Sequence, residues 1–239
     1  MAAILLAGCP VPPAPTGGPA GKAVPGKETG GAAATSAPHL GRPYDVVASD
    51  SLLTILVYRA GALAKAGHNH VIASHDLSGT IYVPADVMRT SFEIHLPVGG
   101  LTVDEASLRA KEGGDFSAEV PDSAKEGTRR NMLGEALLNA EQSAEIILRS
   151  ERLEAGTDGQ LQAHVQAEVR QTPHSLVVPV RYEMSATEVV VSGELPLKQT
   201  DLGLTPFSAL LGALQVQDEM RVKFRIVARP APTSTGAGH

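Results

Sequence analysis

The chain has 239 residues, a formal net charge of −6 and a sequence pI near 5.7, with one cysteine and no tryptophan. A single cysteine excludes an intramolecular disulfide. Nucleic acid is excluded as a partner, because neutralising a phosphate backbone takes clustered cations and no block of Lys and Arg occurs beyond the pair Arg129 and Arg130. No apolar run approaches the roughly 18 residues that a membrane-spanning helix needs.

The first nine residues end in Leu6-Ala7-Gly8-Cys9, which resembles a bacterial lipobox. In lipoproteins with this motif the cysteine is diacylated and begins the mature protein. The apolar run before Cys9 is short and no Lys or Arg precedes it. We therefore predict that residues 1–9 are the remnant of a lipoprotein-type signal with Cys9 as the lipidation site and the true start upstream; the alternative is an idle or buried Cys9. Pro10 is not the aspartate of an inner-membrane retention signal, so outer-membrane anchoring is expected.

Residues 10–42 are rich in Pro, Gly and Ala and contain few large aliphatic side chains. Such a segment cannot bury enough apolar surface to offset the entropy of ordering it, so it is predicted to be a disordered tether. Residues 230–239 have the same character and are predicted to be a disordered tail. The residues between them, 43–229, are enough for one domain with a single core.

From residue 43 onward, apolar and polar side chains alternate with a period of two, most clearly in residues 92–98, 161–169, 176–184 and 220–226. One apolar and one polar face per strand is typical of antiparallel sheet with a single buried side. Turn residues such as those at 156–159 separate the strands at hairpin-like spacing. The predicted fold is all-β with one or two short helices, an antiparallel closed β-barrel of about eight strands, and a sandwich is the alternative.

Two stretches interrupt the alternation. After Pro121, the side chains of Met132, Leu133 and their apolar neighbours recur at helical spacing, and a proline near the first turn favours a helix start. A second short helix is predicted around residues 206–211. Such helices cap an end of a barrel or line its mouth.

Three of the eight histidines, His68, His70 and His75, lie close together in the sequence. On an extended backbone His68 and His70 point to the same face, where they could ligate a metal or haem iron, with His75 or His174 as a third ligand. The alternatives are hydrogen bonds that fix one corner of the barrel, and polar contacts to a lipid headgroup. His174 shares the parity of the apolar face that follows it, which makes it the best outside partner for the pair.

The motifs of common enzymes are missing from the sequence: it has no Gly-x-Ser-x-Gly elbow, Gly-rich phosphate loop or cysteine pair. Ser74 and Asp76 lie near the histidines, but adjacency in sequence does not make a triad. Arg129 and Arg130 could meet a phosphate headgroup, although a solvated helix face is the simpler expectation. The protein is predicted not to be an enzyme, and a hydrolase or isomerase on the same barrel is a minor alternative.

Residues 44–228 resemble the YceI-like family of periplasmic proteins, which are related in fold to lipocalins. The similarity rests on Tyr44-Asp45-Val46, Gly67-His68-Asn69-His70-Val71-Ile72, a helical insert at Arg109–Gly113 and Arg130–Leu133, the hairpin Arg170–Leu176, and Thr200-Asp201-Leu202-Gly203. Two positions depart from the family pattern: Gln171 replaces a glycine and His174 replaces a cation.

The resemblance implies a YceI-like, lipocalin-like barrel in residues 43–229 that holds a polyisoprenoid-type lipid. With 3% aromatic residues the interior must be mainly aliphatic, which suits a flexible hydrocarbon chain and equally a fully packed core. The predicted function is an envelope protein that sequesters or carries an amphiphilic, isoprenoid-like lipid without a cofactor. It would face the periplasm on its lipid anchor. The sequence leaves open whether the protein forms a homodimer. The residues expected to contact the lipid are His68, His70, His174, Met132, Leu133, Val178, Val180 and Tyr182.

Overall fold

The computed structural model describes residues 40–232, and the structural statements below concern these residues. The chain divides into two units, Met1–Ala37 and Pro38–His239, and the second contains every described residue. The predictions for the signal remnant, the lipidated Cys9, most of the tether and the end of the tail lie outside the described residues. Within them no helix is both long enough and apolar enough to cross a membrane.

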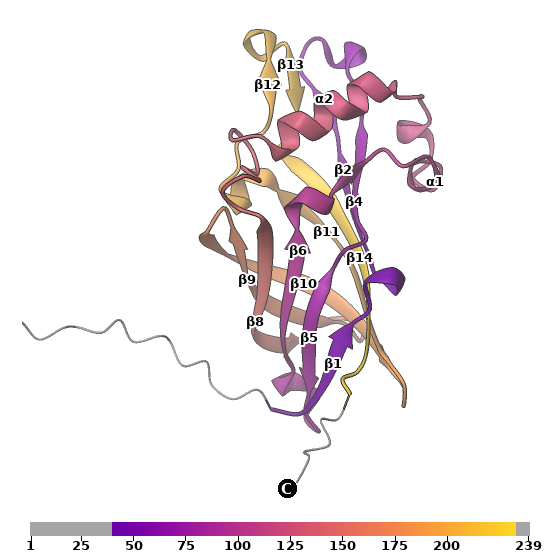
Figure 1. Ribbon diagram of the computed structural model, residues 1–239, viewed down its shortest axis with the longest axis vertical. Helices are drawn as coiled ribbons and strands as arrows, with labels where there is room; N and C mark the ends of the chain where they lie inside the picture. The colour runs from indigo at the N-terminus through magenta and orange to yellow at the C-terminus, as the bar shows by residue number, and fades with distance from the viewer. Residues whose placement is uncertain (1–39, 233–239) are drawn as a thin grey trace, which may run out of the picture. The chain divides into compact units, whose positions relative to one another are not determined.

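Eight antiparallel strands form a closed barrel (Figure 1). In order around the ring they are β1 (Arg42–Val46), β5 (Ser78–Val83), β6 (Ser91–Pro97), β8 (Glu145–Ala155), β9 (Leu161–Val169), β10 (Thr172–Met184), β11 (Val189–Lys198) and β14 (Glu219–Pro230). The ring closes where β14 pairs with β1, so that Tyr44 lies opposite Pro230. This confirms the predicted all-β barrel, and its first and last strands extend one residue beyond each end of the predicted segment 43–229.

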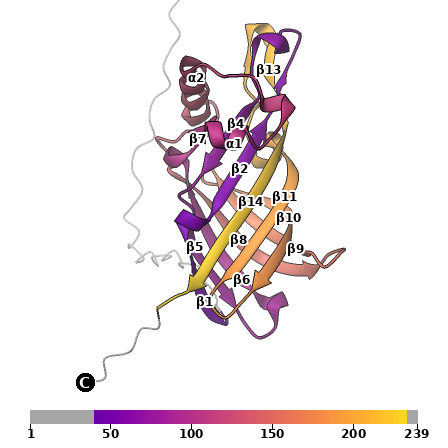
Figure 2. The same cartoon turned by 90° about the vertical axis from the view of Figure 1, so that its right-hand side faces the viewer.

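The sheet widens at one end of the barrel because β14 has two partners on the same side. Its last residues pair with β1, whereas its first half pairs with β2 (Leu52–Val57). β2 in turn pairs with β4 (His70–Ser74), and β4 pairs with β7 (Thr102–Val103). Figure 2 shows this widened part beside the steeply tilted β14, β11 and β10.

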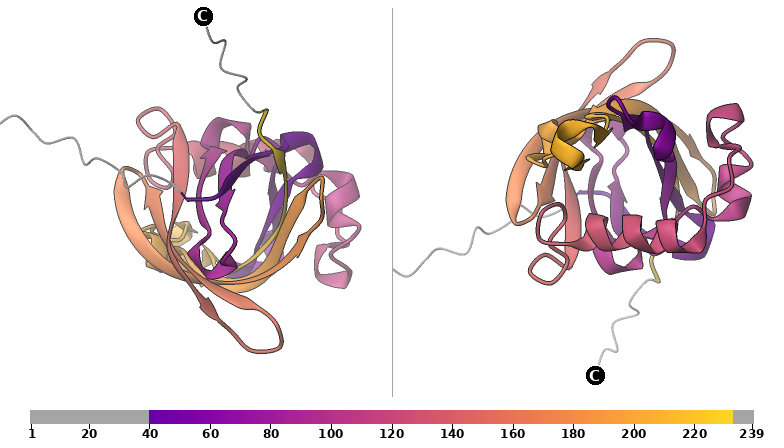
Figure 3. Two further views of the ribbon diagram at one scale, coloured as in Figure 1. Left: turned by 90° about the horizontal axis from the view of Figure 1, so that it is seen from below. Right: turned by 90° about the horizontal axis from the view of Figure 1, so that it is seen from above.

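Two helices and a small sheet lie at this same end. The predicted helix after Pro121 is confirmed as α2 (Asp122–Leu133), which runs along the rim of the barrel (Figure 3) and buries Met132. The second helix is instead the single turn α1 (Ala106–Arg109). The strands β3 (Arg59–Ala60), β12 (Ser208–Ala209) and β13 (Leu214–Val216) form the small sheet. We call this the α2 end.

The helix predicted around residues 206–211 was wrong. These residues enter β12 and then a tight turn, Leu210–Gly212, that leads into β13. Leu210 and Leu211 have backbone φ angles of 52° and 54°, which a right-handed helix does not allow. The apolar residues there resemble one face of a helix, but β12 pairs with β13, which in turn pairs with β3, and this pairing decides the conformation.

The apolar faces predicted from the alternation all point into the barrel. Alternate residues from Phe92 to Leu96, Leu161 to Val169, Leu176 to Met184 and Met220 to Ile226 line its interior. The connections β5–β6, β8–β9 and β10–β11 lie together opposite α2, at what we call the hairpin end. The described chain also starts and stops there, since the Ala231 N–H donates to the Pro43 carbonyl over 3.0 Å.

Candidate functional site

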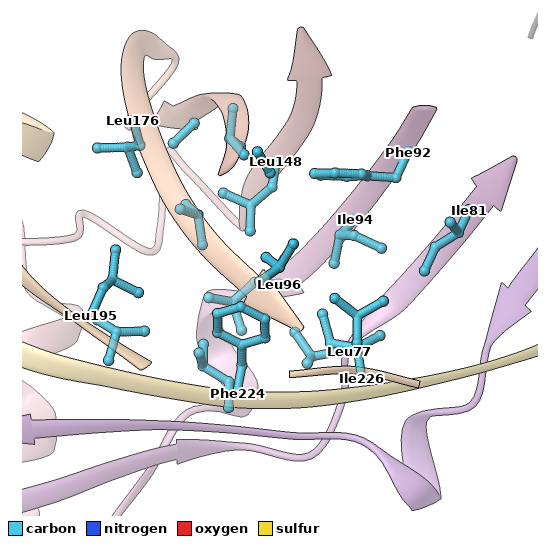
Figure 4. Close-up of a pocket in the computed structure, with 18 of the residues that line it drawn as sticks. Leu77, Ile81, Phe92, Ile94, Leu96, Leu148, Leu176, Leu195, Phe224 and Ile226 are labelled. Atoms are coloured by element: carbon cyan, nitrogen blue, oxygen red, sulfur yellow. The ribbon is translucent and has the colours of Figure 1, made fainter. Parts of the chain in front are cut away.

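The interior of the barrel contains a cavity of about 230 Å³. Its walls come from β2, β5, β6, β8, β9, β10, β11 and β14, and Figure 4 shows side chains of several of these strands converging on it. Ala163 and Ala167 on β9 are buried and small, and they leave free space that larger aliphatic residues would occupy. The interior of this barrel is therefore not completely filled by its own side chains.

The cavity lining is chemically uniform. Of the described residues that form it, only Thr90 and Tyr182 carry a side-chain hydroxyl, and none is charged. Water gains few hydrogen bonds in such a space, whereas hydrocarbon loses none on entering it. The lining therefore favours an apolar chain over a polar or charged ligand.

Of these two hydroxyls, that of Thr90 is buried. Its Oγ1 is buried and has no hydrogen-bond partner among the described residues. A buried hydroxyl without a partner costs free energy, so this oxygen is a candidate partner for a polar group of a ligand. Thr90 is the last residue of the β5–β6 connection and so lies at the hairpin end.

The cavity reaches the surface at the same hairpin end. Tyr182 and Met184, the last inward residues of β10, line the cavity and are nevertheless 40% and 57% exposed. At the α2 end, by contrast, the lining residues Val169 and Met220 are buried. A ligand can therefore enter or extend outward between the hairpins.

The structure separates the predicted ligand contacts into two groups. Val178, Val180 and Tyr182 line the cavity, so their contact with a ligand stays a prediction with a physical basis. Met132 and Leu133 instead pack against the core from α2. His174 packs on Gly203 outside the lining, where a Cβ on Gly203 would lie 2.8 Å from the imidazole.

His68 and His70 also lie outside the cavity, and His70 belongs to a polar network with residues of α1 and α2. His70 Nδ1 is 2.6 Å from Asp104 Oδ2, and Asp104 Oδ1 accepts hydrogen bonds from the Val71 N–H at 2.9 Å and from Arg109 Nη1 at 2.5 Å. Asp104 is 2% exposed and Arg109 8%. The network therefore holds a buried ion pair.

Arg109 binds the backbone as well as Asp104. Its guanidinium donates to the carbonyls of Asn69 (2.8 Å), Phe116 (2.7 Å) and Ala118 (2.9 Å). Arginine suits this position because its planar fork presents several donors in fixed directions. The side chain thereby joins the segment before β4 to the loop between α1 and α2.

The charges of the network are reflected in two pKa values. Burial alone would raise the pKa of Asp104, but hydrogen bonds from His70, the Val71 N–H and Arg109 outweigh it and hold the pKa below its ordinary value. Partial burial, followed by the proximity of His70 and Arg109, lowers the pKa of His68. Asp104 is thus ionised at neutral pH, and in neutral His70 the Nδ1–H donates to it.

Thr128 extends this network to α2. Its Oγ1 lies 3.2 Å from His70 Nε2, which is the acceptor nitrogen of neutral His70. Hydroxyl, imidazole and carboxylate thus follow one another as they do in a hydrolytic triad. Neither the barrel cavity nor a surface hollow of about 560 Å³ between α1 and α2 is lined by Thr128 or His70. We interpret the contact as a structural link between α2 and β4.

Replacing Thr128 with valine should therefore loosen α2 without affecting the barrel. The substitution removes one partly buried hydrogen bond, and the expected loss of stability is about 1 kcal/mol. Hydrogen exchange followed by mass spectrometry should show faster exchange in α2 and unchanged exchange in β9 and β10. Thr187→Val, in the exposed β10–β11 turn, is the matched control; equal protection of α2 in both variants would contradict the link.

His68, His70 and His75 do not converge on a common point. His75 follows the end of β4, and its Nε2 is 2.9 Å from Glu105 Oε1. The rings of His68 and His70 are 6.1 Å apart between centroids, and both nitrogens of His70 are engaged. In residues 40–232 no group of three His, Cys, Asp or Glu side chains is arranged to hold a metal ion. The geometry thus gives the metal- or haem-binding alternative no support.

Comparison with known proteins by sequence gives no relative: no family model matches the chain, and no curated protein matches it. Comparison by structure does. Burkholderia cenocepacia BcnA superposes with a TM-score of 0.56 at 14% identity, over 77% of this chain and 99% of BcnA. A polyisoprenoid binding domain from Saccharophagus degradans, implicated in plant cell wall breakdown, superposes with a TM-score of 0.51 at 12% identity, over 79% of this chain and 98% of that domain.

A Campylobacter jejuni YceI protein is a more distant match, with a TM-score of 0.46 at 8% identity, over 65% of this chain and 82% of the other. At such identities, likeness in structure concerns the fold. The eight-stranded barrel and its two short helices agree with the first two proteins over nearly their whole lengths. The chain therefore has the YceI-like fold.

Proposed function

We propose that this protein binds an amphiphilic lipid with an isoprenoid-like chain inside its barrel and carries or sequesters it in the bacterial envelope. The observation that carries the proposal is the interior cavity of about 230 Å³, whose lining holds no charged side chain among the described residues. A hydrocarbon chain gains about 0.8 kcal/mol per CH₂ group on leaving water and needs no hydrogen-bond partner. The fold shared with a polyisoprenoid binding domain supports the same class of ligand.

The shape of the cavity favours a long, narrow ligand. Its lining includes every inward residue of β9 from Leu161 to Val169, which spans roughly 26 Å along the strand. Strands in barrels tilt by about 40°, so the lining extends roughly 20 Å along the barrel axis. A small volume spread over this length suits a single extended chain.

The polar end of the ligand is proposed to lie at the hairpin end. A charged headgroup would lose its hydration inside the apolar lining, so it must stay outside the cavity. The exposed Tyr182 and Met184 mark where the cavity reaches the surface, and the unpartnered Thr90 Oγ1 lies at the same end. The hydrocarbon would then extend toward α2.

The place of action proposed is the periplasmic side of the envelope, with a lipid anchor on Cys9 in the outer membrane. This part of the proposal rests on the sequence motif and on the composition of residues 10–42. No enzymatic activity is proposed.

Native mass spectrometry of the full chain with Cys9→Ser, purified from a bacterial host without added ligand, tests the proposal. A mass excess of several hundred daltons that is extracted by organic solvent would support it, and the extract would identify the lipid. The bare mass, together with no uptake of added polyprenol, would contradict it and leave the barrel as a scaffold without a ligand.

Thr90→Val should weaken binding of an alcohol-terminated chain by about 2- to 10-fold, because the substitution keeps the shape and removes the buried hydroxyl. Binding of a hydrocarbon of equal length should not fall. Displacement of a fluorescent fatty-chain probe by each ligand gives the two affinities.

The control for this variant is Thr172→Val, at the exposed start of β10 and outside the cavity lining. An equal loss for the alcohol and the hydrocarbon would assign Thr90 a packing role. If neither affinity changed, Thr90 would have no part in placing the polar end.

A further inference from the structure

Four apolar side chains are exposed together at the α2 end of the molecule. Leu210 and Leu211 occupy the β12–β13 turn and are 67% and 109% exposed, and Phe207 and Leu63 are partly exposed in the adjoining segments. The Leu63 N–H donates to the Ala213 carbonyl over 2.8 Å, which joins the two segments. Figures 1 and 2 show this part projecting beyond α2. We call these four residues the leucine tip.

The backbone holds the two most exposed leucines outward. Leu210 and Leu211 both adopt left-handed φ angles, and Gly212 follows with a φ of +87°. Bulky residues avoid this region, and such conformations persist only where the surrounding structure fixes them. Here the turn is closed by the Ala213 N–H, which donates to the Leu210 carbonyl over 3.1 Å. The exposure is thus a property of a defined turn.

The two segments that form the leucine tip carry charges of one sign, and Asp201 and Asp218 flank the second of them. Residues 59–67 contain Arg59 and Lys65, both exposed, and residues 203–217 contain no charged side chain at all. Neither segment contains Asp or Glu, although the whole chain has a net charge of −6. Arg59 is held in place because its Nη1 donates to the Gly67 carbonyl over 2.7 Å.

We propose that the leucine tip docks this protein on the surface of a lipid bilayer that contains anionic headgroups. Exposed aliphatic side chains at a convex tip can enter the boundary between headgroups and acyl chains, and flanking cations are attracted to anionic lipids. Self-association is less well supported, because stable protein interfaces bury about 1,200 Å² or more and four side chains on a projection offer far less.

This contact is distinct from the proposed lipid anchor. The leucine tip lies at the α2 end, whereas the first and last described residues lie at the hairpin end. The docking proposal also requires no lipid in the barrel. If the leucine tip does not bind membranes, the proposed lipid binding in the barrel is unaffected. If the barrel binds no lipid, the docking proposal is likewise unaffected.

Flotation of the full chain with Cys9→Ser on vesicles tests the proposal, with phosphatidylcholine vesicles compared with vesicles that also contain phosphatidylglycerol. The variant carries Leu210→Asn and Leu211→Asn, because asparagine tolerates the left-handed backbone and so should preserve the turn. We expect its partition to the phosphatidylglycerol vesicles to fall by at least about tenfold. Lys65→Gln should weaken only the binding that depends on phosphatidylglycerol and should reduce its sensitivity to salt.

Val177→Asn is the matched control, since Val177 is an exposed apolar residue on the outer face of β10, away from the leucine tip. It should bind vesicles as the parent chain does, and circular dichroism should show all variants folded. Equal binding by the asparagine variant and its parent would overturn the proposal. Absence of vesicle binding by the parent chain would also overturn the proposal. In that case, a dimer in light scattering that is lost in the asparagine variant would show that the leucine tip binds a second copy of the chain.

Discussion

Replacing Arg109 with methionine should lower the free energy of unfolding by about 3–5 kcal/mol, the largest loss we expect from a single change outside the barrel core. The substitution leaves Asp104 buried and ionised without its partner, and it also removes the donors to the carbonyls of Asn69, Phe116 and Ala118. Urea unfolding followed by far-ultraviolet circular dichroism measures the loss, because the barrel dominates that signal.

Two companion variants separate charge from geometry. Arg109→Lys restores the charge but not the planar fork, so its stability should lie between those of the parent and the methionine variant. Arg221→Met removes the exposed pair with Glu194 and should change stability little. If Arg109→Met had the same midpoint of urea unfolding as the parent, the network would contribute little to stability.

The same network predicts a dependence on pH. The pKa of Asp104 in the folded protein is below its ordinary value of 3.8, so its contribution to stability is present above that value and is lost as the pH falls through the folded pKa. Burial raises the pKa of Asp104, and without Arg109 one of the hydrogen bonds that counteract burial is lost. The pKa of Asp104 should therefore rise in this variant. Protonation then relieves the unpaired charge, so the stability gap between parent and Arg109→Met should narrow as the pH is lowered.

The strands and their inward faces could be predicted from the sequence because alternation is a local property. The alternation within one strand shows which of its side chains face a core, independently of the neighbouring strands. This holds for the stretches that end at Leu96, Val169, Met184 and Ile226. Whether that core is hollow depends on side chains from opposite walls, such as Ala163 against its neighbours across the barrel. The combined volume of side chains from opposite walls does not show in any local sequence pattern, so the cavity could not be predicted.

The polar network was missed for a similar reason. His70 was singled out, but its partner Asp104 is 34 residues away in the chain and Thr128 is 58 away. Arg109 was noticed only as part of a helical insert. A carboxylate and an arginine spaced five apart give no signal of burial by themselves, and only the close approach of β4 and β7 brings them beneath His70.

Turns show where local rules can mislead. Arg170 and Gln171 connect β9 to β10 in two residues, both with positive φ, a conformation that favours glycine. Gln171 adopts the conformation and donates from Nε2 to the Gln142 carbonyl over 2.8 Å, a contact that offsets part of the strain. Leu210 and Leu211 adopt similar angles without a glycine, and there the tertiary pairing of β13 with β3 prevails.

Ala163→Trp should abolish the proposed lipid uptake while leaving the barrel folded. Ala163 is 2% exposed, lines the cavity on β9 and lies between Leu153 on β8 and Val178 on β10. An indole placed there occupies space that the ligand chain needs, so lipid recovered per mole of protein in native mass spectrometry should fall by at least about tenfold. Val177→Trp, on the outer face of β10, is the control and should retain its lipid.

Stability of the same variant distinguishes a hollow barrel from a packed one. In a filled core, a substitution of this size overpacks the interior and costs about 1–3 kcal/mol or more. In a hollow barrel freed of lipid by unfolding and refolding, the indole fills empty space and should leave the free energy of unfolding unchanged or raise it by about 0.5–2 kcal/mol. Loss of lipid with preserved stability is therefore the combined result expected of Ala163→Trp. Lipid retention equal to that of the control would contradict a ligand that passes position 163 inside the barrel.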